Sequence, residues 1–107
     1  HGLKYSVIRT ASADDQIRII VLYIAESFGR DVALDKLADR EERVLALGDD
    51  PYMGTEPRYR VLKRQGYRVL VLEKNLVFYK IREDKKEVIL YAVVDQRQDY
   101  VNIVKGL

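Results

Sequence analysis

A basic segment at residues 58–68, RYRVLKRQGYR, holds the densest group of side chains able to bind an anion. Its cationic members are Arg58, Arg60, Lys63, Arg64 and Arg68. The segment contains no acidic residue, whereas residues 31–50 lean acidic, so charge is unevenly distributed although the net charge is only +2. A cationic patch opposite an acidic helix predicts a polyanionic partner. A solvated strand edge protected by charge explains the same segment, and both interpretations stay open at this stage.

Several catalytic schemes lack the residues they need. The chain has no cysteine, which excludes thiol catalysis and disulfides and favours a reducing, cytoplasmic compartment. The only histidine is His1, which together with Gly2 resembles what a cleaved tag leaves, so histidine acid–base catalysis is not expected. Asp95 and Glu73 stand alone and make no metal cluster. Without a Gly-rich phosphate loop, paired carboxylates or a nucleophile elbow, we expect neither a metal nor a cofactor.

The composition predicts one soluble domain over residues 3–107. A chain of 107 residues has room for a single core. Its apolar fraction of 48% and charged fraction of 34% are typical of a globular protein. No stretch approaches the roughly 20 consecutive apolar residues that a membrane-spanning helix needs, so no membrane partner is expected.

The first half of the chain predicts a short strand and a helical hairpin. Residues 4–9 alternate as a strand does. Ser12 followed by Asp15 resembles a capping box that starts a helix, and Gly29 is suited to end it. Asp31 is then expected to cap a second helix that ends near Gly48. The short connection between the two helices predicts an antiparallel pair.

The second half changes from helical to strand periodicity. Residues 58–63, 67–73, 76–82 and 87–94 are predicted as strands, with a two-residue turn at Lys74–Asn75. Short connections make the successive strands antiparallel. Residues 96–107 suit either one helical turn or a final packed segment. The fold class is therefore α+β: an N-terminal strand, an antiparallel helical hairpin, an antiparallel sheet meander and a short C-terminal segment.

The predicted strands at residues 76–82 and 87–94 are apolar on both faces. A sheet covered by helices on one side only should alternate apolar and polar residues. Some apolar surface is therefore expected to remain open for another protein. The alternative is that the loop at residues 49–57 and the C-terminal tail cover the second face.

Four sequence segments together resemble the RelE/ParE toxin superfamily. They are GYRVLV at 66–71, VFYKI at 77–81, VILYAV at 88–93 and RQDY at 97–100, and with the element order they cover nearly the whole chain. The resemblance implies a toxin of a bacterial type II toxin–antitoxin system, held in check by a cognate antitoxin from the same operon. One branch of the superfamily cleaves mRNA in the ribosomal A site, and the other poisons DNA gyrase.

The resemblance to the RNA-cleaving branch assigns residues to a metal-independent endoribonuclease. Arg68 matches the arginine of the GYR strand and Arg97 a second family arginine; both would bind phosphate and stabilise the crowded transition state. Tyr100 would stack on a base or act as a weakly basic phenol, with simple packing as its alternative. The basic residues Arg58, Arg60, Lys63 and Arg64 would bind RNA as a patch, or else face solvent or the antitoxin.

Three functions follow from the resemblance. The first is a RelE-like, ribosome-dependent mRNA endoribonuclease that inhibits translation, favoured by the basic segment and the matched arginines. The second is a ParE-like gyrase poison that inhibits replication, and the third is a catalytically inactive, antitoxin-binding member. The missing histidine favours the last two, as does the tail, which has Ile103 where some RNA-cleaving relatives carry a tyrosine. The expected partners are the antitoxin and either the ribosome with its mRNA or DNA gyrase.

Overall fold

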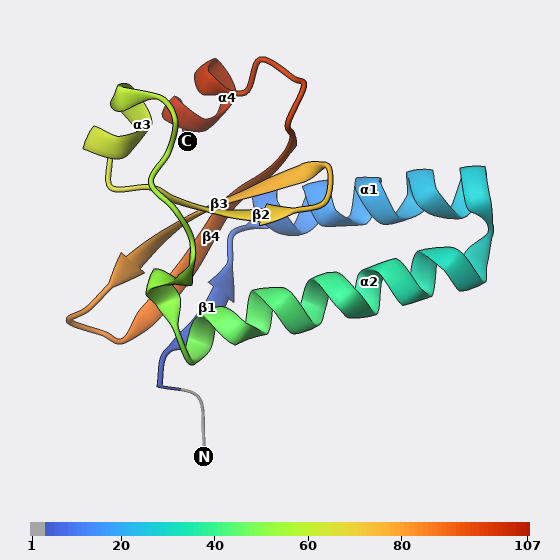
Figure 1. Cartoon of the computed structure of the whole chain (residues 1–107), viewed down its shortest axis with the longest axis horizontal. Helices are drawn as coiled ribbons and strands as arrows, with labels where there is room; N and C mark the ends of the chain where they lie inside the picture. The colour runs from blue at the N-terminus through green and yellow to red at the C-terminus, as the bar shows by residue number, and fades with distance from the viewer. Residues whose placement is uncertain (1–3) are drawn as a thin grey trace.

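A four-stranded sheet with a long helical hairpin on one face organises the chain (Figure 1). The computed structural model describes residues 4–107, and the predicted tag remnant at residues 1–2 lies outside that range. The elements are β1 (Ser6–Arg9), α1 (Ala11–Phe28), α2 (Arg30–Leu45), two 3-10 turns (Ala46–Gly48 and Pro51–Met53), α3 (Arg60–Arg64), β2 (Arg68–Leu72), β3 (Asn75–Arg82), β4 (Glu87–Asp95) and α4 (Val101–Lys105). None of the helices described is long and apolar enough to cross a membrane.

The sheet order β1–β4–β3–β2 confirms the predicted α+β class. The strands β2, β3 and β4 form the antiparallel meander, and β1 adds to β4 in parallel, so the sheet is mixed. The meander turn after β2 differs in detail from the prediction. Glu73, with φ 45°, is the turn residue in the left-handed region. Asn75 instead begins β3 with its side chain buried, where it accepts a hydrogen bond of 3.1 Å from the guanidinium of Arg40.

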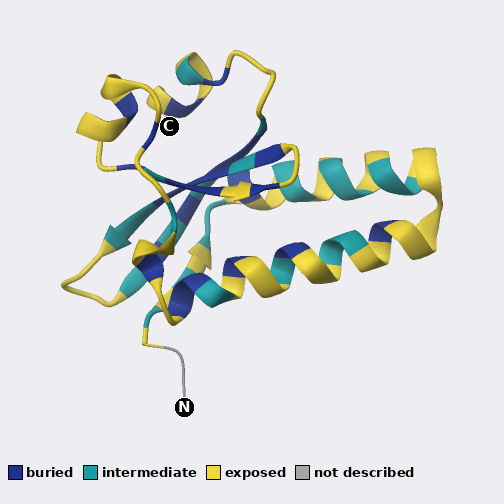
Figure 2. Ribbon diagram, viewed as in Figure 1, coloured by how far each residue is buried: buried dark blue, intermediate teal, exposed yellow. Residues whose placement is uncertain are grey.

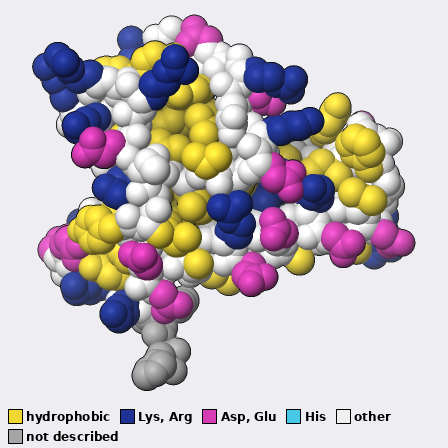
Figure 3. Space-filling view, viewed as in Figure 1, with side chains coloured by type: hydrophobic (Ala, Val, Ile, Leu, Met, Phe, Trp, Pro, Cys, Tyr) yellow, Lys and Arg dark blue, Asp and Glu magenta, His cyan; other side chains and the backbone are white. Residues whose placement is uncertain are grey.

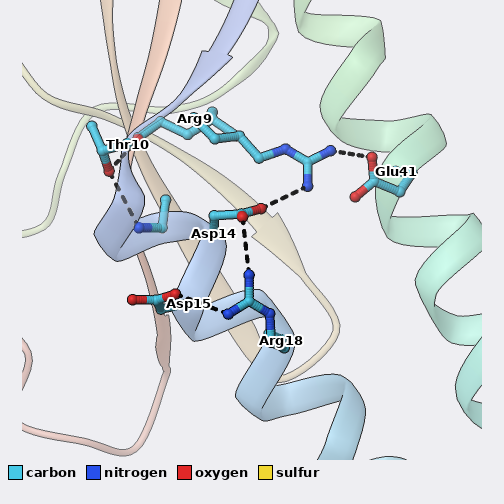
Figure 4. Close-up of polar contacts among 8 residues, drawn as sticks. Arg9, Thr10, Asp14, Asp15, Arg18 and Glu41 are labelled. Atoms are coloured by element: carbon cyan, nitrogen blue, oxygen red, sulfur yellow. Dashed lines mark hydrogen bonds and ion pairs between the residues drawn. The ribbon is translucent and has the colours of Figure 1, made fainter.

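The start of α1 is fixed by Thr10 and not by the predicted capping pair Ser12–Asp15 (Figure 4). The hydroxyl of Thr10 accepts a hydrogen bond of 3.2 Å from the backbone N–H of Ala13. Such a cap satisfies one of the free N–H groups at a helix start. Arg9, the last residue of β1, forms ion pairs with Asp14 of α1 and Glu41 of α2. Strand and hairpin are therefore tied together at the same corner.

Gly29 joins the two helices, as predicted. Its φ of 95° lies where residues with a Cβ are strained, and its N–H bonds the carbonyl of Ala25 to close α1. The second helix starts at once with Arg30, so Asp31 lies inside its first turn and does not cap it. Beyond the sheet, the far half of the hairpin projects outward (Figure 1).

Buried apolar residues lie on both faces of the sheet, and the buried colour runs along its strands (Figure 2). On the hairpin side the core includes Leu47, Leu70, Val77, Tyr79 and Leu90. On the other side it includes Leu62, Phe78, Ala92, Tyr100 and Val104. Leu62 comes from α3 and Val104 from α4, so the C-terminal tail does pack on the second face, together with α3. The alternative raised from the sequence therefore holds for the tail, while an apolar strip of this face at Val69, Val71 and Leu76 stays open as a groove, with Val71 45% exposed.

The prediction of a strand at residues 58–63 is wrong, because this part of the chain packs on the second face. Residues 60–64 form a helical turn that buries Leu62 completely in the second core. Gly66, with φ 91°, then lets the chain turn into β2. Apolar side chains are also exposed on α1, where Ile19, Leu22, Tyr23 and Phe28 are 55–66% exposed.

Candidate functional site

Arg68 stands at the first position of β2 and holds the loop that precedes α3. Its Nη2 donates hydrogen bonds to the carbonyl oxygens of Tyr52, at 3.0 Å, and Gly54, at 2.6 Å. The guanidinium also lies 5.3 Å from the centre of the Tyr52 ring. Its Nε is buried and has no hydrogen-bond partner among the described residues. The Nη2 group of Arg68 is thus committed to the loop.

A single carboxylate with several partners, which the sequence did not reveal, contacts the same loop. Glu83, in the β3–β4 turn, accepts hydrogen bonds from the hydroxyls of Tyr52 and of Tyr5, the latter at 2.7 Å. Lys86 lies 3.4 Å from the same carboxylate. These contacts, led by the Tyr52 hydroxyl, lower the pKa of Glu83 below its usual 4.5. A single glutamate in a tight turn carries no sequence signal of this role.

Arg97 lies in the connection between β4 and α4, with its side chain 81% exposed. Its Nε and Nη2 contact the two carboxylate oxygens of Asp95, at 3.2 and 3.3 Å. The same carboxylate accepts a hydrogen bond of 2.8 Å from the Arg97 backbone. The guanidinium lowers the pKa of Asp95. Arg97 is therefore held in a local turn by a short-range, solvent-exposed ion pair.

The structure places Arg68 and Arg97 at opposite ends of β2. Arg68 begins the strand. At the other end Leu72 pairs with Asn75 of β3, and Asn75 pairs in turn with Asp95 of β4. Arg97 comes two residues after Asp95. Four strand steps separate the two ends, which corresponds to about 13 Å. In the arrangement observed the two guanidinium groups bind different partners, the loop carbonyls for Arg68 and the Asp95 carboxylate for Arg97.

Tyr100 lies between these ends on the second face, where it is only 8% exposed. Its ring packs against Phe78, with 5.2 Å between ring centres, and against Tyr59, at 5.7 Å. Burial raises the pKa of Tyr100, which makes the phenol a poorer source of a phenolate base. The geometry gives this residue a packing contact with α3 and the core.

The basic residues of the segment 58–64 come together on the outside of α3. Arg58, Arg60, Lys63 and Arg64 are all exposed. Lys63 forms an ion pair of 2.9 Å with Glu56. Within residues 4–107, the three arginines have no carboxylate within ion-pair distance. The predicted cationic patch therefore exists as a surface, although it sits on a helix and not on a strand edge.

A shallow groove of about 290 Å³ adjoins this patch. Its floor includes Val69, Val71 and Leu76, and Arg58 and Tyr100 stand at its sides. Figure 3 shows the apolar floor as a hollow in the upper half of the molecule, with cationic side chains gathered around it. The arrangement can bind an anionic or extended ligand. Among residues 4–107 it brings together no nucleophile, base and oxyanion-binding group at reacting distance.

Comparison with known proteins identifies the family of this chain. The model of the family "ParE toxin of type II toxin-antitoxin system, parDE" matches residues 7–100. The chain belongs to this toxin family. The RelE/ParE resemblance inferred from four sequence segments is thereby confirmed. No curated protein matches the chain in sequence.

Two solved structures share the fold of this ParE-family chain. The first is the chromosomal ParDE toxin–antitoxin system from P. aeruginosa, with a TM-score of 0.71, 21% sequence identity, and coverage of 86% of this chain and 96% of that one. The second is the toxin–antitoxin complex RelBE2 from Mycobacterium tuberculosis, with a TM-score of 0.63, 17% identity, and coverage of 92% and 98%. At these identities the likeness establishes the architecture alone.

Proposed function

We propose that this ParE-family toxin acts by poisoning DNA gyrase. One observation carries the proposal: the side chains expected to cut RNA do not converge on one point. Arg68 binds a loop, Arg97 binds Asp95 about 13 Å further along the sheet, and Tyr100 is buried. Metal-independent RNA cleavage needs its phosphate-binding and proton-transfer groups around one phosphate. A gyrase poison needs only a binding surface, and the ParE family match agrees with that function.

An antitoxin is the partner that this function requires in the cell. The two solved structures named above are described as a toxin–antitoxin system and a toxin–antitoxin complex. The open apolar surface of α1, formed by Ile19, Leu22 and Tyr23, is a suitable contact for such a protein. An amphipathic helix can cover a surface of this kind with residues at helical spacing. Co-expression with the neighbouring open reading frame should therefore restore growth.

Induced expression followed by pulse labelling tests the proposal. We expect incorporation of a labelled DNA precursor to fall first, together with an SOS response, while protein synthesis continues for longer. An early halt of protein synthesis with cuts in A-site codons would contradict gyrase poisoning. Induction without any growth defect would indicate an inactive, antitoxin-binding member.

The exposed cations beside the groove favour a second candidate, the RelE-like mRNA endoribonuclease predicted from the sequence. For that activity Arg68 would have to leave the carbonyls of Tyr52 and Gly54 and turn toward RNA. Primer extension on mRNA from induced cells separates the two candidates, because only the endoribonuclease produces new 5′ ends within codons.

A further inference from the structure

The outer face of α3 carries a row of cations that the proposed function has not yet used. In a helix, residues three and four positions apart lie on the same side. Arg60, Lys63 and Arg64 share such a face, while Leu62 points the opposite way and is fully buried. The buried leucine fixes the rotation of this short helix. The three cations are therefore held outward by core packing.

Two further cations widen this face into a patch. Gln65, at the end of α3, donates a hydrogen bond of 3.0 Å to the carbonyl of Lys105, the last residue of α4. This contact holds the backbone of Lys105, an exposed residue, beside α3. Arg58 precedes the helix and lies 5.9 Å from the ring of Tyr59, which is 41% exposed. The α3 patch thus consists of Arg58, Arg60, Lys63, Arg64 and Lys105, with Glu56 as the carboxylate paired to it.

We propose that the α3 patch binds the sugar–phosphate backbone of duplex DNA. This inference rests on the proposed function, since gyrase holds duplex DNA where a poison must act. Arg60 and Arg64 are separated by about 6 Å along the helix axis, and one DNA strand presents a phosphate every 3.4 Å or so along its axis. The pair therefore spans about two phosphates of a strand. Arginine matches phosphate oxygens with a planar fork and stays charged at any relevant pH.

The patch lacks the features of a sequence-reading surface. Phosphate contacts position a protein on DNA and carry no sequence information, which comes from side chains that reach base edges in a groove. The helix has five residues and its outward side chains are cationic, apart from the half-exposed Val61. Binding should consequently be independent of sequence and strongly dependent on salt. In a complex of toxin, gyrase and DNA, the α3 patch would add a contact that keeps the toxin on the gyrase-bound DNA.

Fluorescence anisotropy with a labelled 20-base-pair duplex tests this directly on the full chain. Four cations, allowing for the Glu56 pair, predict a loss of about 150-fold in affinity between 50 and 200 mM salt, since the logarithmic slope is about −0.9 per phosphate neutralised. The double variant Arg60→Gln, Arg64→Gln should lose only about 12-fold over the same range, because two cations remain. Its binding at 50 mM salt should be correspondingly weaker.

The matched control removes the same charge elsewhere. Arg30 at the hairpin bend and Lys85 in the β3–β4 turn are exposed and distant in the fold from α3. The variant Arg30→Gln, Lys85→Gln should keep the wild-type slope. No duplex binding by the wild type at 50 mM salt, or equal slopes for both variants, would overturn the proposal. Tighter binding to a single-stranded RNA of the same length would overturn the assignment to DNA.

A second measurement separates this inference from the proposed function. Binding of the toxin to gyrase in the absence of DNA should be the same for the wild type and the Arg60→Gln, Arg64→Gln variant, whereas trapping of cleaved plasmid should fall about tenfold in the variant. Loss of gyrase binding without DNA would show that the patch contacts protein, which contradicts the proposal. A wild type that binds duplex DNA but never traps gyrase would refute the gyrase function and leave the DNA contact standing.

Discussion

Replacing Arg68 with alanine should destabilise the protein as well as alter its toxicity. The guanidinium donates to two backbone carbonyls and stacks on Tyr52, so the substitution removes the side-chain contact between β2 and the loop that includes Gly54, and leaves the Thr55–Val69 backbone bridge in place. Hydrogen bonds to a charged group contribute about 1.5–3 kcal/mol each when buried. The Tyr52 bond is solvent-exposed, so that bond and the stacking interaction are worth about 0.5–1 kcal/mol each.

The sum predicts a loss of about 2.5–5 kcal/mol in the free energy of unfolding. Urea denaturation followed by circular dichroism measures it, and with a slope near 1.5 kcal/mol/M the midpoint should fall by about 1.7–3.3 M. Arg82→Ala is the matched control, because Arg82 is exposed at the end of β3 and its nearest carboxylate, Asp84, is 3.9 Å away. That change should stay within about 0.5 kcal/mol.

A loss for Arg68→Ala no larger than that of Arg82→Ala would refute the argument that Arg68 anchors the loop. The guanidinium would then be free to bind a phosphate, as the endoribonuclease hypothesis requires. Toxicity should be measured at a temperature at which both variants remain folded. Under that condition the gyrase proposal expects Arg68→Ala to retain much of its toxicity, whereas the endoribonuclease hypothesis expects it to lose nearly all.

Three further changes test other parts of the account. Gly54→Ala should cost about 1–3 kcal/mol, visible as a lower melting temperature, because a Cβ there would meet the Tyr79 hydroxyl and lie 2.6 Å from the Val69 carbonyl oxygen; an unchanged melting temperature would contradict the close approach. Leu62→Ala should cost about 2–5 kcal/mol by the same assay, since that side chain is fully buried; a loss below 1 kcal/mol would argue against α3 packing on the sheet. Glu83 has a folded-state pKa below its usual 4.5. Its contribution to the free energy of unfolding is therefore fully present above pH 4.5 and is lost as the pH falls through the lowered pKa. Glu83→Gln should therefore flatten the fall in stability on acidification, and identical pH profiles would contradict this role.

Periodicity predicts the helical hairpin and the meander well, because these elements bury long apolar stripes. Ile17, Ile20 and Ile24 recur at helical spacing and face the core at least in part. The segment at residues 58–63 alternates over a few residues and resembles a strand, yet it folds as a helix. Its conformation depends on the site that Leu62 fills between Phe78 and Val104, and these residues are distant in sequence. Short elements of this kind are fixed by tertiary packing, which local pattern cannot report.

The candidate site shows the same division between residue type and residue environment. The sequence locates the basic residues of the segment 58–64, and the structure places them on an exposed surface around α3. It cannot tell which arginines are free, because the partners of Arg68 are backbone carbonyls that any residue at those positions would offer. The pairing of Arg97 with Asp95 is local, two residues apart, and is a signal that spacing could have found.

Cleavage of supercoiled plasmid by purified gyrase in the presence of the purified toxin tests the central claim most directly. The account predicts that linear DNA, covalently attached to gyrase, accumulates only when toxin and gyrase are both present, and that the antitoxin abolishes it. Intact supercoiled plasmid at saturating toxin, with codon-specific cuts in mRNA when the same preparation is added to translating ribosomes, would contradict it.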